Sequence, residues 1–205
     1  MRFTWMVAGL LALTGASGAW AENVIETFDR SSGALDGILT PGSDGPWTLS
    51  IENGAAQLVN DKDANAIKFY RVEKLRGGVS PAGSAIAVDV SGDFPDRNSG
   101  AGILYQHDQA TRSYLAFVVG SHRWTLYQRG AEGMRPRLSG ELPVAKNPVR
   151  RLRIQPDGEQ LALEIDGQVM GRVKVVNMPG SAVGIVGVSE GRFVFDNLAI
   201  IPRTP

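Results

Sequence analysis

The stretch GAGILYQHDQATRSYLAFVVGSHRWTLYQRG, residues 100–130, decides the fold of this chain. Its apolar runs predict three consecutive strands, over residues 101–106, 114–120 and 124–129. The polar turns HDQATRS and SH separate these strands. Because strands joined by short turns pair in an antiparallel manner, we expect them to form the central sheet of an all-β fold.

The sequence on either side of this stretch repeats the pattern of short apolar runs and turns. It predicts strands over residues 24–28, 47–52, 55–58, 66–72, 84–90, 149–155, 160–166, 168–176, 182–188 and 192–200. The dipeptides Asn53-Gly54 and Asp166-Gly167 favour two-residue hairpin turns, because both positions of such a turn need a positive φ. Residues 31–46 and 130–148 contain repeated Gly and Pro, and we expect loops there.

Alternation of apolar and polar residues indicates which face of each strand is packed. Five residues of the strands within 149–166 share the predicted core face: Leu152, Ile154, Leu161, Leu163 and Ile165. The same rule assigns Trp124, Leu126 and Gln128 to the core. It leaves four residues on the opposite, solvent face of that strand: Arg123, Thr125, Tyr127 and Arg129.

The first 21 residues have the features of a secretory signal peptide. Arg2 supplies a positive charge, residues 5–13 are apolar, and Ala19-Trp20-Ala21 fits the small-x-small cleavage pattern. An uncleaved membrane anchor is the alternative, but this apolar run is shorter than the roughly 20 residues that a span requires. We therefore expect a periplasmic or secreted protein that begins at Glu22, with residues 22–205 as one domain and no further membrane span.

Cysteine content and charge exclude several classes of protein. The chain has no cysteine, which excludes disulfides, thiolate metal sites and a lipid anchor on an N-terminal Cys. Residues 22–205 contain 20 basic and 21 acidic residues, because Arg2 is the one charged residue of the predicted signal. This balance gives no basic excess for nucleic acid or for an anionic membrane surface. Phosphate-binding, dinucleotide-binding and nucleophile-elbow motifs are also absent.

Seven short motifs resemble the concanavalin A-like lectin/glucanase superfamily, in particular its laminin-G-like and 3-keto-disaccharide hydrolase-like domains. They are the Gly100, Gly102, Tyr105 strand, Y-x-x-x-V (114–118), W-x-L-Y (124–127), R-L-R-I (151–154), E-I-D-G-Q (164–168), V-G-I-x-G (183–187) and F-D-N-L (195–198). The resemblance covers about residues 28–200. It implies an antiparallel jelly-roll β-sandwich with a concave outer surface where carbohydrate often binds.

Glu164 and Asp166 are the candidate catalytic residues. Glu164-Ile165-Asp166 resembles the first half of the E-x-D-x-E motif of laminarinase-type glycosidases, but Gln168 replaces the third carboxylate. Two carboxylates two residues apart on a strand share a face at about 6.6 Å, so a pair is geometrically possible. The alternative interpretation pairs Glu164 with Arg151 or Arg153 of the preceding strand and places Asp166 in a hairpin turn.

We expect no cofactor, and calcium is the one metal that the sequence makes worth considering. Asp93, Asp96 and Asn98 bring oxygen ligands together in one loop, although without the spacing of a known calcium loop. The turn-forming tendency of Asp, Pro and Asn explains the same residues without a metal. His107 and His122 both lie in predicted turns and lack the spacing of a zinc site.

A ligand surface is predicted on the central sheet. Tyr127 between Arg123 and Arg129 offers an aromatic face for a sugar ring and guanidinium donors for its hydroxyls, and Tyr105, Tyr114 and His107 can join them. A merely solvated strand face is the alternative.

Three functions stay open: an exported protein that binds a glycan or an envelope component, a glycosidase-like enzyme, and a structural or protein-interaction domain. Aromatic rings without an acidic pair in the cleft would favour the first, an acidic pair the second, and a flat apolar patch the third.

Overall fold

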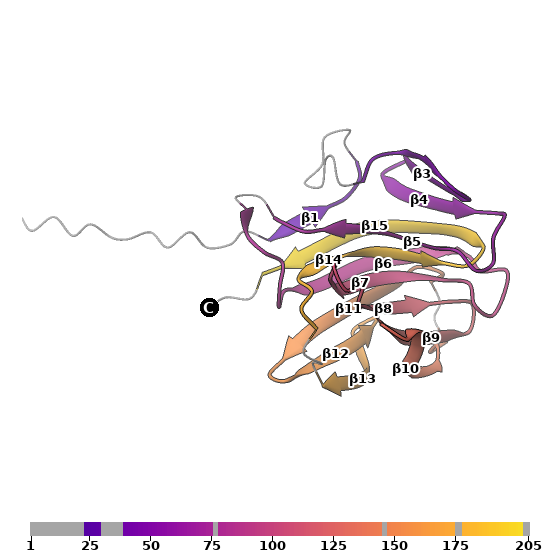
Figure 1. Ribbon diagram of the computed structural model, residues 1–205. Helices are drawn as coiled ribbons and strands as arrows, with labels where there is room; N and C mark the ends of the chain where they lie inside the picture. The colour runs from indigo at the N-terminus through magenta and orange to yellow at the C-terminus, as the bar shows by residue number, and fades with distance from the viewer. Residues whose placement is uncertain (1–22, 30–38, 76–77, 145–146, 175–177, 203–205) are drawn as a thin grey trace, which may run out of the picture.

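The computed structural model describes residues 23–29, 39–75, 78–144, 147–174 and 178–202. The predicted signal peptide, residues 1–21, lies outside these ranges. The regular elements are antiparallel strands in two sheets that pack face to face (Figure 1). No helix in the described ranges has the length and apolar character needed to cross a membrane.

The nine-stranded sheet has the order β13-β12-β11-β6-β15-β4-β3-β2, and β1 pairs with β15. Its strands are β1 (Val24–Glu26), β2 (Gly42–Asp44), β3 (Trp47–Glu52), β4 (Ala55–Asn60), β6 (Ala85–Asp93), β11 (Arg150–Asp157), β12 (Gln160–Ile165), β13 (Gln168–Lys174) and β15 (Gly191–Ile201). The six-stranded sheet has the order β10-β9-β8-β7-β14-β5. Its strands are β5 (Ile67–Val72), β7 (Gly100–His107), β8 (Tyr114–Val119), β9 (Arg123–Gly130), β10 (Gly133–Glu141) and β14 (Ala182–Val188).

The main core fills the space between the sheets and confirms the predicted jelly-roll sandwich. Trp124 and Leu126 of β9 face inward, and Trp124 makes an edge contact with Phe117 of β8 at 6.0 Å between ring centroids. The nine-stranded sheet contributes the five predicted residues of β11 and β12, each at most 1% exposed. Both predicted hairpin turns are present, because Asn53-Gly54 and Asp166-Gly167 have positive φ at each position.

Two strands lie where loops were expected. Residues 130–148 include β10, and residues 31–46 include β2. Both strands lie at the edges of their sheets, where one side of the backbone needs no strand partner and Pro is tolerated. Pro136 of β10 is accommodated by a register shift between Pro136 and Leu138. Within the described part of these two stretches, the loop prediction is therefore wrong for residues 42–44 and 133–141.

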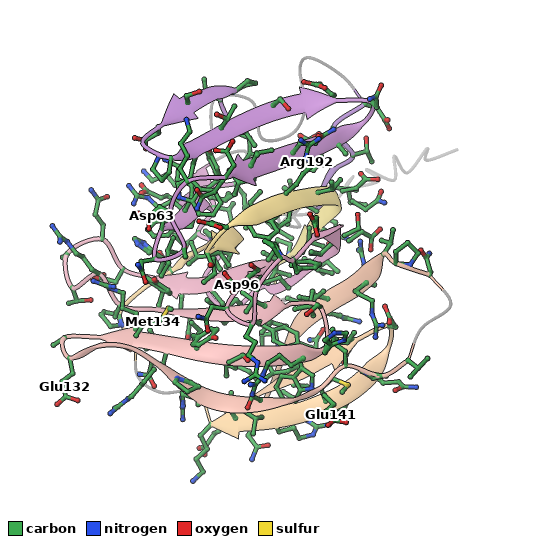
Figure 2. All side chains as sticks on the ribbon, turned by 90° about the vertical axis from the view of Figure 1, so that its right-hand side faces the viewer. Asp63, Asp96, Glu132, Met134, Glu141 and Arg192 are labelled. Carbon is green, nitrogen blue, oxygen red and sulfur yellow. The ribbon has the colours of Figure 1, made fainter. Side chains whose placement is uncertain are left out.

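A second apolar cluster covers the outer face of the six-stranded sheet. Its buried members alternate with the core residues of the same strands and are Leu104, Tyr114, Ala116, Val118, Val186 and Val188. Ile67, Phe69, Tyr127 and Met134 pack against them from the flanking strands. Figure 2 shows Met134 on β10, next to the hairpin tip at Glu132. Because these residues are buried although they face outward, the large side chains of the flanking strands must cover part of this surface.

Candidate functional site

The outer face of the six-stranded sheet contains a pocket of about 370 Å³, called here the aromatic pocket. Its lining comes from β5, β8, β9 and the end of β7 with the turn that follows, and comprises Ile67, Phe69, Arg71, His107, Gln109, Arg112, Tyr114 and Arg129. Three of these residues, His107, Tyr114 and Arg129, belong to the predicted ligand surface. The pocket therefore brings half of the predicted surface together with residues from a distant strand.

Three rings form the apolar part of this pocket. The centroids of Phe69 and His107 lie 4.8 Å apart, those of Phe69 and Tyr114 5.7 Å, and those of His107 and Tyr114 5.9 Å. Phe69 is on β5 and Tyr114 on β8, and β14 and β7 lie between them. Three strand spacings amount to about 14 Å, so the two side chains lean toward each other across the sheet. The small residue Gly184 of β14 lies opposite Leu104 and Arg71 in the floor between them.

A β-bulge at the end of β7 decides which of its side chains reach the pocket. Gln106 has a φ of 51°, and the pairing of β7 with β14 shifts register between Ala182 and Gly184. The bulge turns His107 to the outer face, while Tyr105 points into the main core and is 1% exposed. The prediction that Tyr105 belongs to the ligand surface is therefore wrong, since its hydroxyl donates to the Ser84 carbonyl at 3.0 Å.

Guanidinium groups surround the rings. Arg71 donates to the Glu73 carboxylate at 2.7 Å and to the Gln109 side-chain carbonyl at 3.0 Å. Arg112 extends from the β7–β8 turn, in which Asp108 accepts hydrogen bonds from the backbone N–H and hydroxyl of Thr111. Arg129 lies across from Tyr114 in the β8–β9 register. The polar part of the lining thus consists mainly of hydrogen-bond donors from the three guanidinium groups. Gln109 adds a side-chain amide.

Burial and charge perturb the two titratable rings of the pocket. Burial lowers the pKa of His107, and the positive charge of Arg71 lowers it further, against the opposing effect of Asp108 and Glu73. Burial raises the pKa of the Tyr114 hydroxyl, and the charge and hydrogen bonding of Arg129 only partly offset this rise. These shifts favour the neutral imidazole and the protonated phenol, and the Tyr114 hydroxyl donates to the Met134 sulfur at 3.9 Å.

Tyr127 and Arg123 lie outside the aromatic pocket on the same face of β9. Tyr127 is half-buried, lies next to Ala116 in the register and packs against the second apolar cluster. Arg123 is exposed at the start of β9 and donates to the Ser139 hydroxyl at 3.1 Å.

Arg123, Tyr127 and Arg129 thus lie on the predicted outer face of β9, but Thr125 of the same face is only 5% exposed. Gln128, which was assigned to the core, is half-buried and does not belong to it. Arg129 lines the aromatic pocket, whereas Arg123 lines a different hollow.

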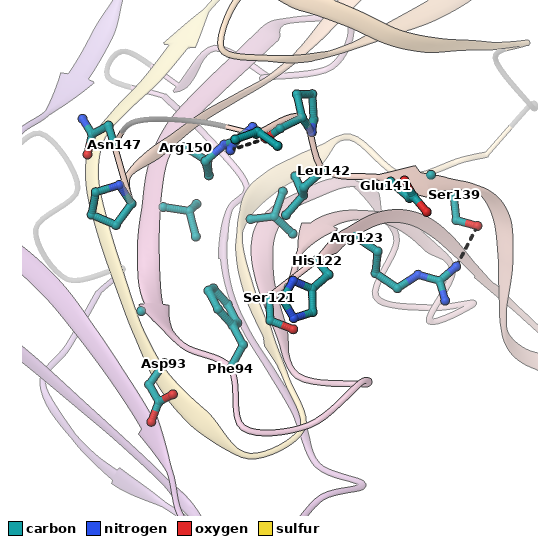
Figure 3. A pocket seen from close by; sticks show the side chains of 18 residues that line it. Asp93, Phe94, Ser121, His122, Arg123, Ser139, Glu141, Leu142, Asn147 and Arg150 are labelled. Carbon is teal, nitrogen blue, oxygen red and sulfur yellow. Dashed lines mark hydrogen bonds between the residues drawn. The ribbon is translucent and has the colours of Figure 1, made fainter.

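Arg123 lines the larger hollow, a cleft of about 1010 Å³ at one end of the sandwich, called here the end cleft (Figure 3). The figure shows Asp93 and Glu141 on different sides of it, with Phe94 and His122 between. Arg150 also lines it, but this side chain is held by the Asp166 carboxylate at 2.9 Å and donates to the Pro143 carbonyl. The end cleft offers mixed charge and no group of contacting rings.

Glu164 and Asp166 belong to the other sheet and its β12–β13 turn, and neither side chain lines the aromatic pocket or the end cleft. Asp166 binds Arg150 and accepts the backbone N–H of Arg151 at 2.8 Å, while Glu164 lies 3.9 Å from Arg153. The pairing of Glu164 with Arg153 and the turn at Asp166 agree with the alternative interpretation, and the ion pair of Asp166 with Arg150 adds to it. Nearby, Arg151 of β11 forms an ion pair with Asp89 of β6 at 3.0 Å and donates to the Asn197 carbonyl of β15 at 2.8 Å.

The calcium candidates form a turn. Asp96 accepts hydrogen bonds from the backbone N–H groups of Asn98 and Ser99 and from the Ser189 hydroxyl. Burial alone would raise the pKa of Asp96, but these hydrogen bonds outweigh it and the pKa is lowered. Within the described ranges, no group of three or more His, Cys, Asp or Glu side chains converges on a point that could hold a metal ion.

Sequence reasoning missed Phe69, Arg71, Gln109 and Arg112. The first two alternate with Ile67 on one face of β5, and this pattern was visible in the sequence. Nothing local, however, indicated that β5 would lie in the same sheet as β8 and β9. The pairing of β5 with β14, more than 100 residues later, brings them together.

No family model and no curated protein matches this chain. Several solved structures do match it in fold. A Bacillus subtilis protein of unknown function with a galectin-like fold is 12% identical, with a TM-score of 0.61, over 87% of this chain and 96% of the other. A B. subtilis carbohydrate-binding module is 12% identical, with a TM-score of 0.50, over 76% and 90% of the chains. The laminarinase catalytic domain of Thermotoga petrophila is 9% identical, with a TM-score of 0.54, over 80% and 82%. At such identities the likeness concerns the fold, and the chain has the jelly-roll fold of concanavalin A-like type.

Proposed function

We propose that this protein binds carbohydrate, free or as part of a cell-envelope polymer, at the outer face of its six-stranded sheet. One observation carries the proposal: the aromatic pocket combines three contacting rings with guanidinium and amide groups, and its lining includes no Asp or Glu. Aromatic faces stack against the apolar C–H patches of sugars, and the polar groups fix the hydroxyls. A carbohydrate-binding module among the structures of similar fold agrees with this reading.

A glycan array on the wild-type protein, followed by titration of Phe69→Ala with the best ligand, tests the proposal. Phe69 lines the aromatic pocket, contacts the rings of His107 and Tyr114, and is only half-buried. Truncation of an aromatic anchor costs about 2 kcal/mol of binding free energy, or roughly thirtyfold in affinity. Unaltered binding by Phe69→Ala, or no glycan bound by the wild type, would contradict the proposal.

The same titrations distinguish the enzyme alternative. Glu164→Gln removes the candidate acid on the opposite sheet, and we expect it to bind glycan as the wild type does. Oligosaccharide cleavage by the wild type that Glu164→Gln abolishes would instead support a hydrolase. A protein that binds no glycan and cleaves none would leave the structural or interaction function.

We further propose that the protein is exported and begins at Glu22. The signal features of residues 1–21 support this proposal. Intact-mass measurement of the exported protein tests it, and a mass that retains these residues would contradict it.

A further inference from the structure

We propose that the sugar bound in the aromatic pocket carries a carboxylate, as a uronic acid does. This inference rests on the proposed function and concerns the charge of the ligand. Its starting point is the pocket lining, which includes three arginines and no acidic side chain. The chain as a whole has equal numbers of basic and acidic residues, so composition does not explain this local excess of positive charge.

Two of the three guanidinium groups lack an ion-pair partner in the part of the chain that the structure describes. Arg71 is neutralised by Glu73. Among the described residues, no carboxylate lies within ion-pair distance of Arg112 or Arg129. The Asp108 carboxylate accepts hydrogen bonds from Thr111 within its own turn and lies beyond ion-pair distance of all three arginines. Cations gathered in one hollow repel each other, and an anion bound between them removes that cost.

The three arginines come from separate elements: Arg71 from β5, Arg112 from the β7–β8 turn and Arg129 from β9. They share the pocket lining with the half-buried ring of Phe69 and with His107 and Tyr114, which are only 5% and 3% exposed. A ligand seated there therefore meets the Phe69 ring and the guanidinium groups together. Guanidinium groups bind planar carboxylates through two parallel hydrogen bonds, while rings stack on the sugar. A carboxylated pyranose offers both features, whereas a neutral sugar leaves the charges without a partner.

Calorimetric titration with an oligogalacturonate and with its fully methyl-esterified form tests the inference. The two probes share the sugar rings and differ in charge. We expect the acidic form to bind at least tenfold more tightly, with an affinity that falls as salt rises. Arg112→Gln and Arg129→Gln should each weaken the binding of the acidic oligogalacturonate roughly ten- to hundredfold. Arg97→Gln, an exposed arginine of the β6–β7 loop, is the matched control and should leave it unchanged.

The outcomes separate this inference from the proposed function. Equal binding of the two probes, with no effect of Arg112→Gln or Arg129→Gln, would overturn the acidic ligand and leave carbohydrate binding in place. Displacement of the oligogalacturonate by an equal concentration of acetate would show that the carboxylate alone is recognised, against a sugar ligand. Binding of neither probe, together with an empty glycan array, would overturn both proposals.

Discussion

Tyr105 and His107 lie two residues apart on β7 and occupy opposite faces of the sheet, because the bulge at Gln106 interrupts the alternation between them. Tyr105 fixes the core side of the strand through its hydrogen bond to the Ser84 carbonyl. His107 contacts the ring of Phe69 on the outer side. One irregular residue thus separates a structural tyrosine from a histidine of the candidate site.

Tyr105→Phe should lower stability and leave ligand binding unchanged. Burial raises the pKa of Tyr105 to about 12, so its hydroxyl stays protonated as a donor at any ordinary pH. Removal of the hydroxyl leaves the buried Ser84 carbonyl without this partner, at a cost of about 1–2 kcal/mol. Urea unfolding and glycan titration of the variant measure the two effects. A loss of affinity without a loss of stability would return Tyr105 to the ligand surface.

Gly180→Ala should disturb the bulge and, with it, the pocket. A Cβ at this position would lie 2.2 Å from the Gln106 carbonyl oxygen and 2.4 Å from the His107 carbonyl carbon, so the backbone must shift. Overpacking of this kind costs about 1–3 kcal/mol. Gly130→Ala is the matched control, because its Cβ would have no atom within 4 Å. We expect lower stability and weaker glycan binding for Gly180→Ala alone, and equal unfolding midpoints for the two variants would refute this prediction.

Stability should fall with decreasing pH partly through His107. An unfolded histidine has a pKa of about 6.5, and burial followed by the charge of Arg71 lowers the folded value. As the pH falls, His107 therefore binds a proton in the unfolded chain before it does so in the folded protein. The free energy of unfolding falls as the pH drops below about 6.5 toward the pKa of the folded state. Urea midpoints at pH 7.5 and 5.5 for the wild type and His107→Gln measure this contribution.

The control for this pH effect is His122→Gln, which removes the exposed and only other histidine of the chain. It leaves one imidazole, so a proton NMR titration reports His107 directly. His107→Gln should lose less stability than the wild type on acidification, and His122→Gln should resemble the wild type. A His107 pKa at or above 6.5 would show that the burial of the ring does not have the expected effect.

Trp124→Ala should destabilise the sandwich by about 3–5 kcal/mol. Trp124 is 3% exposed and contacts Phe117 across the β8–β9 pair, and a smaller side chain leaves a cavity between the sheets. Urea unfolding measures the loss, with Arg123→Ala as the exposed control on the next residue. An unchanged midpoint for Trp124→Ala would mean that this ring does not support the core.

The sequence by itself determined most of the regular part of the fold, apart from the edge strands β2 and β10. Strict alternation predicted the inward faces of β9, β11 and β12, because side chains of a strand alternate between its faces and the apolar set must be buried. The dipeptides Asn53-Gly54 and Asp166-Gly167 predicted two turns, because a positive φ is a local property of the residues concerned. Both kinds of information lie within a few residues of the feature that they predict.

The tertiary structure alone decided the pocket. The bulge at Gln106 depends on how β7 pairs with β14, and it moved Tyr105 and His107 to opposite faces. The contact of Phe69 with Tyr114 depends on the order of four strands within one sheet. Pairing between strands far apart in the chain sets both features, and no local periodicity carries that information. The candidate site is therefore a product of strand order, whereas the sandwich around it follows from residue pattern.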